Sequence, residues 1–134
     1  MLADFLSDLG AFISYFLAGG LSTLVYMLVY SKITPYPELE LIKSRNQAAA
    51  IAFGGSLLGF MLAITALIRS AVNMMDFAMW SIVAIIIQVA TYFVVQLAFP
   101  KIAKRIEDGE VPSAIWLAAA SIAAGMLNAA SLTY

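Results

Sequence analysis

An uncharged, apolar stretch of 23 residues, 46–68, constrains the fold of this chain more than any other feature. At about 1.5 Å per residue, a helix of this length crosses the roughly 30 Å of hydrocarbon in a bilayer. Small side chains recur along it, among them Ala52, Gly55 and Gly59. Because small residues let two membrane helices approach closely, the stretch predicts a transmembrane helix in the middle of a bundle.

The composition of the whole chain agrees with a membrane protein. Of its 134 residues, 63% are hydrophobic and 11% are charged, which is more apolar surface than a soluble domain of this size can bury. The net charge is −1, and no basic face indicates nucleic acid binding. There is no Cys and no His. We therefore expect the lipid bilayer as a partner, no nucleic acid, no metal and no cofactor.

Four apolar segments of about 20 residues or more favour helices over strands. The predicted spans are residues 10–30, 47–70, 77–97 and 112–132, with residues 1–9 as an interfacial lead-in continuous with the first. Polar connections at residues 31–47 and 98–111 contain prolines, which end helices. The predicted fold class is an all-α membrane protein, with one four-helix transmembrane domain over residues 1–134.

The basic residues of the loops predict the orientation of the chain. Three lie in the 31–47 connection, three lie in the 98–111 connection, and Arg69 alone lies near the central turn. By the positive-inside rule, both polar connections are cytoplasmic and both termini are outside.

The polar connections also carry acidic side chains interleaved with Lys and Arg. These are Glu38, Glu40, Glu107, Asp108 and Glu110. Such acids could hold a cation, but a mixed charge run is typical of a solvated interfacial face. We therefore expect these acids to face solvent.

The sequence pattern predicts an internal repeat of one helical hairpin. Residues 1–70 and residues 71–134 each contain a helix, a proline-bearing connection and a helix rich in small residues. Ser56 matches Ser121 at an offset of 65, whereas Gly59 matches Gly125 at 66. Both hairpins have the same orientation, so the pattern predicts two parallel repeats about an axis along the membrane normal.

The sequence Asn46-Gln47-Ala48-Ala49-Ala50-Ile51, followed by Gly54-Gly55-Ser56-Leu57-Leu58-Gly59-Phe60, resembles the signature of a known family. The segment from Gly125 to Ala130 is similar to the second copy of that signature. The family is the domain of unknown function 350 family, the YjfL-like small bacterial inner-membrane proteins. The resemblance covers nearly the whole chain and implies four helices in two repeats, a bacterial inner (plasma) membrane and no established activity.

Two sets of small residues are candidates for helix packing: Gly55 with Gly59, and Ser121 with Gly125. Their spacing of four residues suits close helix contact. The spacing alone does not distinguish packing inside one chain from self-association, so both remain open.

Five polar residues within or at the ends of the spans are further candidates. We expect three amide side chains to make contacts between helices, or alternatively to line a polar path: Gln88, Gln96 and Asn128. Arg69 and Asp76 lie close together at the outer end of the bundle and predict an ion pair.

We find no nucleophile–base pair, phosphate loop or metal motif in the chain, so we expect no catalytic residues and no enzyme activity. The leading hypothesis is a structural or accessory membrane subunit that forms a homo-oligomer (a dimer or higher) or binds a membrane or cytoplasmic protein. The alternative is a small oligomeric channel or transporter for an ion or small solute.

Overall fold

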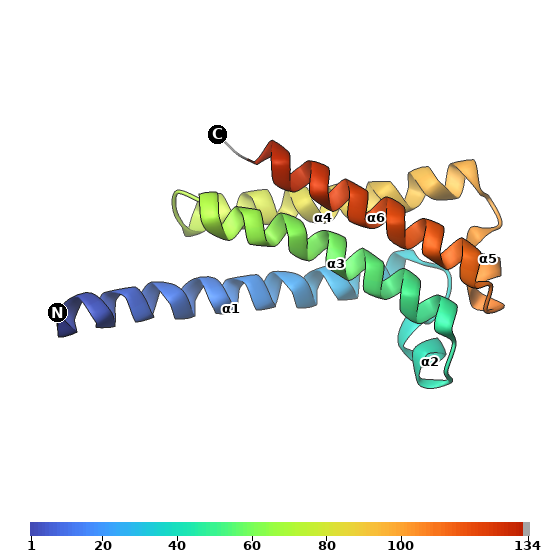
Figure 1. The fold of residues 1–134 in the computed structure, drawn as a ribbon, viewed down its shortest axis with the longest axis horizontal. Coiled ribbons are helices and arrows are strands. Elements are labelled where there is room, and N and C mark those ends of the chain that lie inside the picture. The colour runs from blue at the N-terminus through green and yellow to red at the C-terminus, as the bar shows by residue number, and fades with distance from the viewer. Residues whose placement is uncertain (133–134) are drawn as a thin grey trace.

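The structure, a computed structural model, describes residues 1–132, and every regular element in that range is a helix. The long helices lie along one direction, and the short helices lie at one end of them (Figure 1). The elements are α1 (Leu2–Ile33), α2 (Glu38–Lys43), α3 (Gln47–Ser70), α4 (Met74–Ala98), α5 (Ile102–Glu107) and α6 (Val111–Ser131). The long helices are all long and apolar enough to span a membrane, which confirms the predicted all-α membrane fold.

Two asparagines define where central helices begin. The Asn46 side chain accepts a hydrogen bond from the Ala49 N–H, and α3 starts at residue 47 as predicted. The Asn73 side chain likewise accepts a hydrogen bond from the Asp76 N–H. Helix α4 therefore starts at residue 74, three residues before the predicted start at residue 77. A side-chain acceptor at this position satisfies a backbone donor that has no partner inside the helix.

The closest contact between helices joins α3 and α6, which run in the same direction (Figure 1). A β-carbon built at Gly55 would overlap Ala118, and one built at Gly59 would overlap the Ser121 carbonyl. Gly125 packs in the same way on the backbone of Gly59. The candidate packing residues therefore meet one another inside this chain, where the missing side chains let the two backbones touch.

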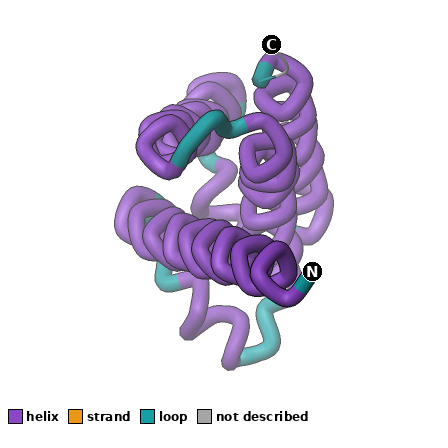
Figure 2. The backbone as a smooth tube through the Cα atoms, turned by 90° about the vertical axis from the view of Figure 1, so that its left-hand side faces the viewer, coloured by secondary structure: helices purple, strands orange, loops and turns teal. Residues whose placement is uncertain are grey.

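Helix α1 stands apart from the bundle over its first half. Every residue from 1 to 14 is exposed, whereas Tyr26 and Tyr30 further along are fully buried. Figures 1 and 2 show the N-terminal end of α1 diverging from the other long helices. At 32 residues, or about 48 Å, α1 is longer than a span requires.

The two short helices lie at the same end of the bundle, which we call the α2–α5 end (Figure 1). Helix α5 buries Ile102 and Ile106, and helix α2 buries Glu38. The expectation that the connection acids face solvent is wrong for Glu38, whose exposed fraction is 1%. The turn after α1 carries Pro35 and Pro37, and it returns the first residue of α2 to the end of α1.

The order of long, short and long helix occurs twice, as α1 to α3 and as α4 to α6. Helices α1 and α4 run in one direction, and α3 and α6 run in the other (Figure 1). This arrangement accommodates the two repeats at residues 1–70 and 71–134, which stay a prediction.

Candidate functional site: a buried polar column

Glu38 is the most unusual side chain at the α2–α5 end. It follows Pro37, whose backbone is extended, and begins α2. One carboxylate oxygen, Oε1, accepts a hydrogen bond of 2.7 Å from the hydroxyl of Thr34 at the end of α1. The other oxygen, Oε2, is buried and has no partner within residues 1–132. A buried carboxylate is costly unless it is paired, so this oxygen requires an explanation.

Three buried tyrosines lie within electrostatic range of this carboxylate. Tyr30 comes from α1, Tyr36 from the connection and Tyr92 from α4, and each lies close enough to interact electrostatically with Glu38. The rings of Tyr30 and Tyr92 meet edge to face, with centroids 5.8 Å apart. All three hydroxyls are buried without a hydrogen-bond partner among the described residues. The carboxylate and the three hydroxyls are therefore all buried at this end of the bundle.

Burial changes the acidity of the two groups in the connection. It raises the pKa of Glu38 above its ordinary value, although the hydrogen bond from Thr34 partly opposes this effect. Burial also raises the pKa of Tyr36, and the neighbouring Tyr92 and Glu38 add to the increase. Both effects favour the neutral forms.

A second group of polar side chains lies in the middle of the bundle. The Tyr26 hydroxyl on α1 is hydrogen-bonded to the Ser56 hydroxyl on α3. The Gln88 amide on α4 donates to the Ser121 carbonyl at 3.2 Å and lies 3.5 Å from the Ser56 carbonyl. A β-carbon at Gly59 would come within 2.8 Å of that amide nitrogen. Gln88 thus joins three helices, while its own carbonyl oxygen has no partner in the described chain.

Two more buried polar atoms lie towards the opposite end of the bundle. Ser81 is seven residues before Gln88 on α4, and Asn128 is seven residues after Ser121 on α6. Since α4 and α6 run in opposite directions, both are displaced by about 10 Å in the same sense. The Ser81 hydroxyl and the Asn128 amide nitrogen also lack partners in residues 1–132.

Together these side chains form what we call the polar column. It is defined by the seven buried side-chain polar atoms in residues 1–132 that make no hydrogen bond, together with the bonded hydroxyls of Tyr26 and Ser56. The polar column consists of Tyr36, Glu38, Tyr30, Tyr92, Tyr26, Ser56, Gln88, Ser81 and Asn128.

Among the polar candidates from the sequence, Gln88 and Asn128 lie in the polar column. Gln96 is half-buried and lies instead on a cleft of about 310 Å³ at the α2–α5 end. The cleft is lined by Pro35, Tyr36, Gln96, Pro100, Ala103, Lys104 and Glu107. Tyr36 therefore belongs both to the cleft and to the polar column.

The pair of Arg69 and Asp76 stays a prediction. The Asp76 carboxylate accepts a hydrogen bond of 3.1 Å from the Val72 N–H. The ion pairs found in residues 1–132 join other side chains, at the α2–α5 end. Both Arg69 and Asp76 lie at the far end of the bundle from Glu38.

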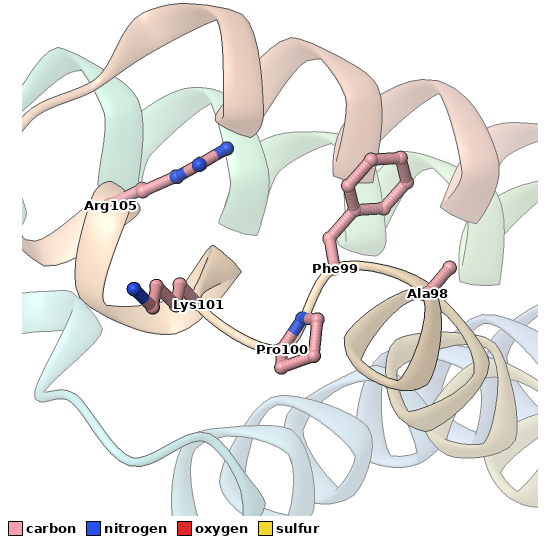
Figure 3. A pocket seen from close by; sticks show the side chains of 5 residues that line it. All are labelled: Ala98, Phe99, Pro100, Lys101 and Arg105. Atoms are coloured by element: carbon pink, nitrogen blue, oxygen red, sulfur yellow. The ribbon is translucent and has the colours of Figure 1, made fainter.

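A basic hollow of about 340 Å³ lies where α4 passes into α5, and Figure 3 shows the side chains that line it. Lys101 and Arg105 lie along it with Phe99 and Pro100, and its residues are exposed. The Arg105 Nε atom is 3.6 Å from a carboxylate oxygen of Glu110. The hollow is thus a charged surface feature, separate from the polar column.

Sequence reasoning did not identify Glu38 or the tyrosines as a site. Tyr26 and Tyr30 are four residues apart, which places both on one face of α1. That spacing, with Tyr36 six residues further on, was the one signal available. Nothing in the sequence connects these residues to Tyr92, which lies on a helix after the central turn.

Residues 4–132 match the sequence profile of the Domain of Unknown Function (DUF350) family. The chain belongs to the DUF350 family. It is 34% identical over 129 residues to the UPF0719 inner membrane protein YjfL of Escherichia coli K12, covering 96% of this chain and 98% of that protein. The YjfL protein of Escherichia coli O157:H7 matches to the same extent. No solved structure matches. The resemblance stated from the sequence is confirmed, and this DUF350 protein is a membrane protein similar to inner-membrane proteins.

Proposed function

We propose that this DUF350 protein is non-enzymatic and acts as a small channel or transporter for an ion or small solute, with the polar column as its path. One observation carries the proposal: within residues 1–132, seven buried side-chain polar atoms without a hydrogen-bond partner are spread from the α2–α5 end, through the middle of α4, to the last turn of α6. In a low-dielectric interior each such atom costs on the order of 1–3 kcal/mol. Apolar side chains would pack the same space at lower cost, so a role in function explains their presence.

The column reaches most of the length of the bundle. Glu38 lies at the α2–α5 end, Gln88 lies near the middle of α4, and Asn128 lies in the last turn of α6. A path for an ion needs polar groups at each of these depths, because hydrocarbon solvates no charge.

The proposal includes an orientation. The α2–α5 end carries six of the seven Lys and Arg residues, and the opposite end carries only Arg69. The positive-inside rule places the connections 31–47 and 98–111 in the cytoplasm and both termini outside. Glu38 then lies at the cytoplasmic end of the path, and the membrane is the bacterial inner membrane.

Purified protein in liposomes is expected to pass a small ion or solute, and either Gln88→Leu or Asn128→Leu should abolish that flux. Each substitution removes a buried amide from the path and leaves an apolar side chain of similar size. Flux of protons, Na⁺, K⁺ and small neutral solutes is measured with trapped indicators or by swelling.

The matched control for these variants is Thr65→Val. The Thr65 hydroxyl is exposed and bonds only to the Met61 carbonyl of its own helix, so flux should be unchanged. An absence of flux for every species in the wild-type protein would contradict the proposal.

A second candidate function is that of an accessory subunit which self-associates through α1. The observation that favours it is the exposure of every residue from 1 to 14 of a helix that continues beyond the bundle. The small residues Gly55, Gly59 and Gly125 are already packed inside the chain. Association with a second copy, or with another membrane protein, would therefore use α1.

Single cysteines test both this association and the orientation, because the chain has none of its own. We expect Ser7→Cys on α1 to form disulfide-linked dimers in membranes and Val72→Cys, exposed in the central turn, to remain monomeric. In cells with a permeabilised outer membrane, an impermeant maleimide should label Val72→Cys directly and Ser7→Cys after its disulfide has been reduced.

Ser44→Cys is the control for orientation, since residue 44 is exposed in the 31–47 connection. It should stay unlabelled until the inner membrane is opened. Labelling of Ser44→Cys from outside would overturn the orientation. A Ser7→Cys variant that stays monomeric would argue against association through α1.

A further inference from the structure

We propose that the species carried by the polar column is the proton, that Glu38 is the group that binds it, and that it arrives from the cytoplasm through the cleft beside Tyr36. This inference rests on the proposed transport function and names its substrate. It depends on three features: the groups around Glu38, the hydroxyls that lead away from it, and the cleft that reaches it.

The groups around Glu38 suit a proton better than a metal cation. Metal cations bind several oxygen ligands at once, with carboxylates preferred among side chains. Glu38 offers one free carboxylate oxygen, and within residues 1–132 no three acidic side chains gather into a potential metal site. A proton needs only one lone pair, which Oε2 provides.

The ion pairs within residues 1–132 join other side chains and none includes Glu38. Its surroundings are the Thr34 hydroxyl and Tyr30 from α1, Tyr36 from the connection, and Tyr92 from α4. Helix α3 packs against α2, and its one ionisable side chain is Arg69 in its last turn. Protonation is therefore the way in which this carboxylate becomes neutral in place. Burial raises the pKa of Glu38, which agrees with this expectation.

Hydroxyl groups continue from Glu38 into the bundle. A tyrosine or serine hydroxyl both donates and accepts a hydrogen bond, so a row of them can pass a proton along. Tyr30 interacts electrostatically with Glu38, and its ring centroid lies 5.7 Å from that of Tyr26, whose hydroxyl is bonded to Ser56. The Tyr30 hydroxyl has no fixed partner in the described residues, which leaves it free to turn towards either neighbour.

The cleft brings water as far as Tyr36, which interacts electrostatically with Glu38. Its volume of about 310 Å³ holds several waters, and Tyr36 lines it together with the polar side chains of Gln96, Lys104 and Glu107. The Tyr36 hydroxyl itself is buried close to Glu38. Tyr36 thus stands between the water-accessible surface and the carboxylate.

Uptake and release of the proton form and break a single O–H bond at Glu38. A proton from cytoplasmic water forms an O–H bond with Oε2, and the carboxylate becomes a neutral carboxylic acid. When the proton leaves along the hydroxyls, that bond breaks and the carboxylate is restored. The positive charge moved across the membrane must be compensated by another ion, which the experiment supplies as K⁺.

The test uses the full chain in liposomes that contain a trapped pH indicator, with a K⁺ gradient and valinomycin to draw protons inwards. The wild-type protein should acidify the lumen, and Glu38→Gln should reduce the rate to that of protein-free liposomes. Glutamine keeps the acceptor for Thr34 and the size of the side chain, so the fold is retained. Glu40→Gln on the exposed side of the same helix is the matched control and should behave like wild type.

Tyr36→Phe should slow proton uptake without abolishing it, because it removes one hydroxyl between the cleft and Glu38. Infrared difference spectra should also show a carboxylic acid band that appears as the pH falls and is absent from Glu38→Gln. Flux of Na⁺ or K⁺ instead of protons would overturn the proton assignment and leave the transport function standing. Equal proton flux in Glu38→Gln would overturn the role of Glu38, and no flux of any species would overturn both proposals.

Discussion

Gly125→Leu should prevent this protein from reaching its native packing, and Gly125→Ala should destabilise it by about 3 kcal/mol or more. A β-carbon at Gly125 would overlap the backbone of Gly59, not the end of a flexible side chain. Helix α6 must therefore move away from α3 as a whole. Overpacking a core costs typically 1–3 kcal/mol even where side chains can adjust. Fluorescence-detected gel filtration after heating would measure the loss as a lower melting temperature in detergent.

Gly54→Ala is the control for this prediction. Gly54 is next to Gly55 on α3, but nothing lies within 4 Å of a β-carbon built there. Alanine is the better helix former by about 1 kcal/mol in soluble hosts, so the melting temperature should stay the same or rise. If Gly125→Ala had the same melting temperature as the wild type, α3 and α6 could not pack as closely as in this structure.

The sequence was sufficient to predict the four spans because length and apolarity alone decide them. The limits of α3 were predicted correctly, since Asn46 caps one end and Arg69 with Ser70 marks the other. The start of α4 was missed by three residues, because the cap at Asn73 lies before the apolar run. α1 continues through the amphipathic lead-in to Leu2, beyond the span itself.

Packing was predictable only in part. Gly55, Gly59, Ser121 and Gly125 were recognised as contact residues, but the sequence could not tell whether their partner was the same chain or another copy. Spacing on one helix gives the face that makes contact and not the helix that it meets. The contact between Gly59 and Gly125 is a tertiary contact, which depends on how the two helices pack.

The polar column was the least predictable part of the molecule. Glu38 lies among charged residues in a proline-bearing connection, a context in which most acids are solvated, as exposed Glu40 is here. Tyr92, which interacts electrostatically with Glu38, is distant in sequence and comes near only because α4 packs beside α1. No local pattern records such a contact. Gln88 and Asn128 were easier to identify, because amides within an apolar span stand out by composition.

Wild-type protein should become less stable as the pH rises, and Glu38→Gln should remove that dependence. Burial raises the pKa of Glu38 in the folded state above the ordinary value of 4.5. Below 4.5 the side chain is neutral in both states, so folding carries no ionisation cost and the stability is fully present. As the pH rises through the folded-state pKa, the buried side chain ionises at a cost that the unfolded chain does not bear, and that stability is lost.

Melting temperatures of both proteins, measured from the ordinary glutamate pKa up to about pH 8, check this sign. The two curves should converge at the acidic end and separate towards neutral pH, with Glu38→Gln the more stable there. Glu40→Gln should follow the wild type throughout, because Glu40 is exposed. Parallel curves for wild type and Glu38→Gln would mean that another group ionises in this range. The buried carboxylate would then be neither the source of the pH dependence nor a suitable proton site.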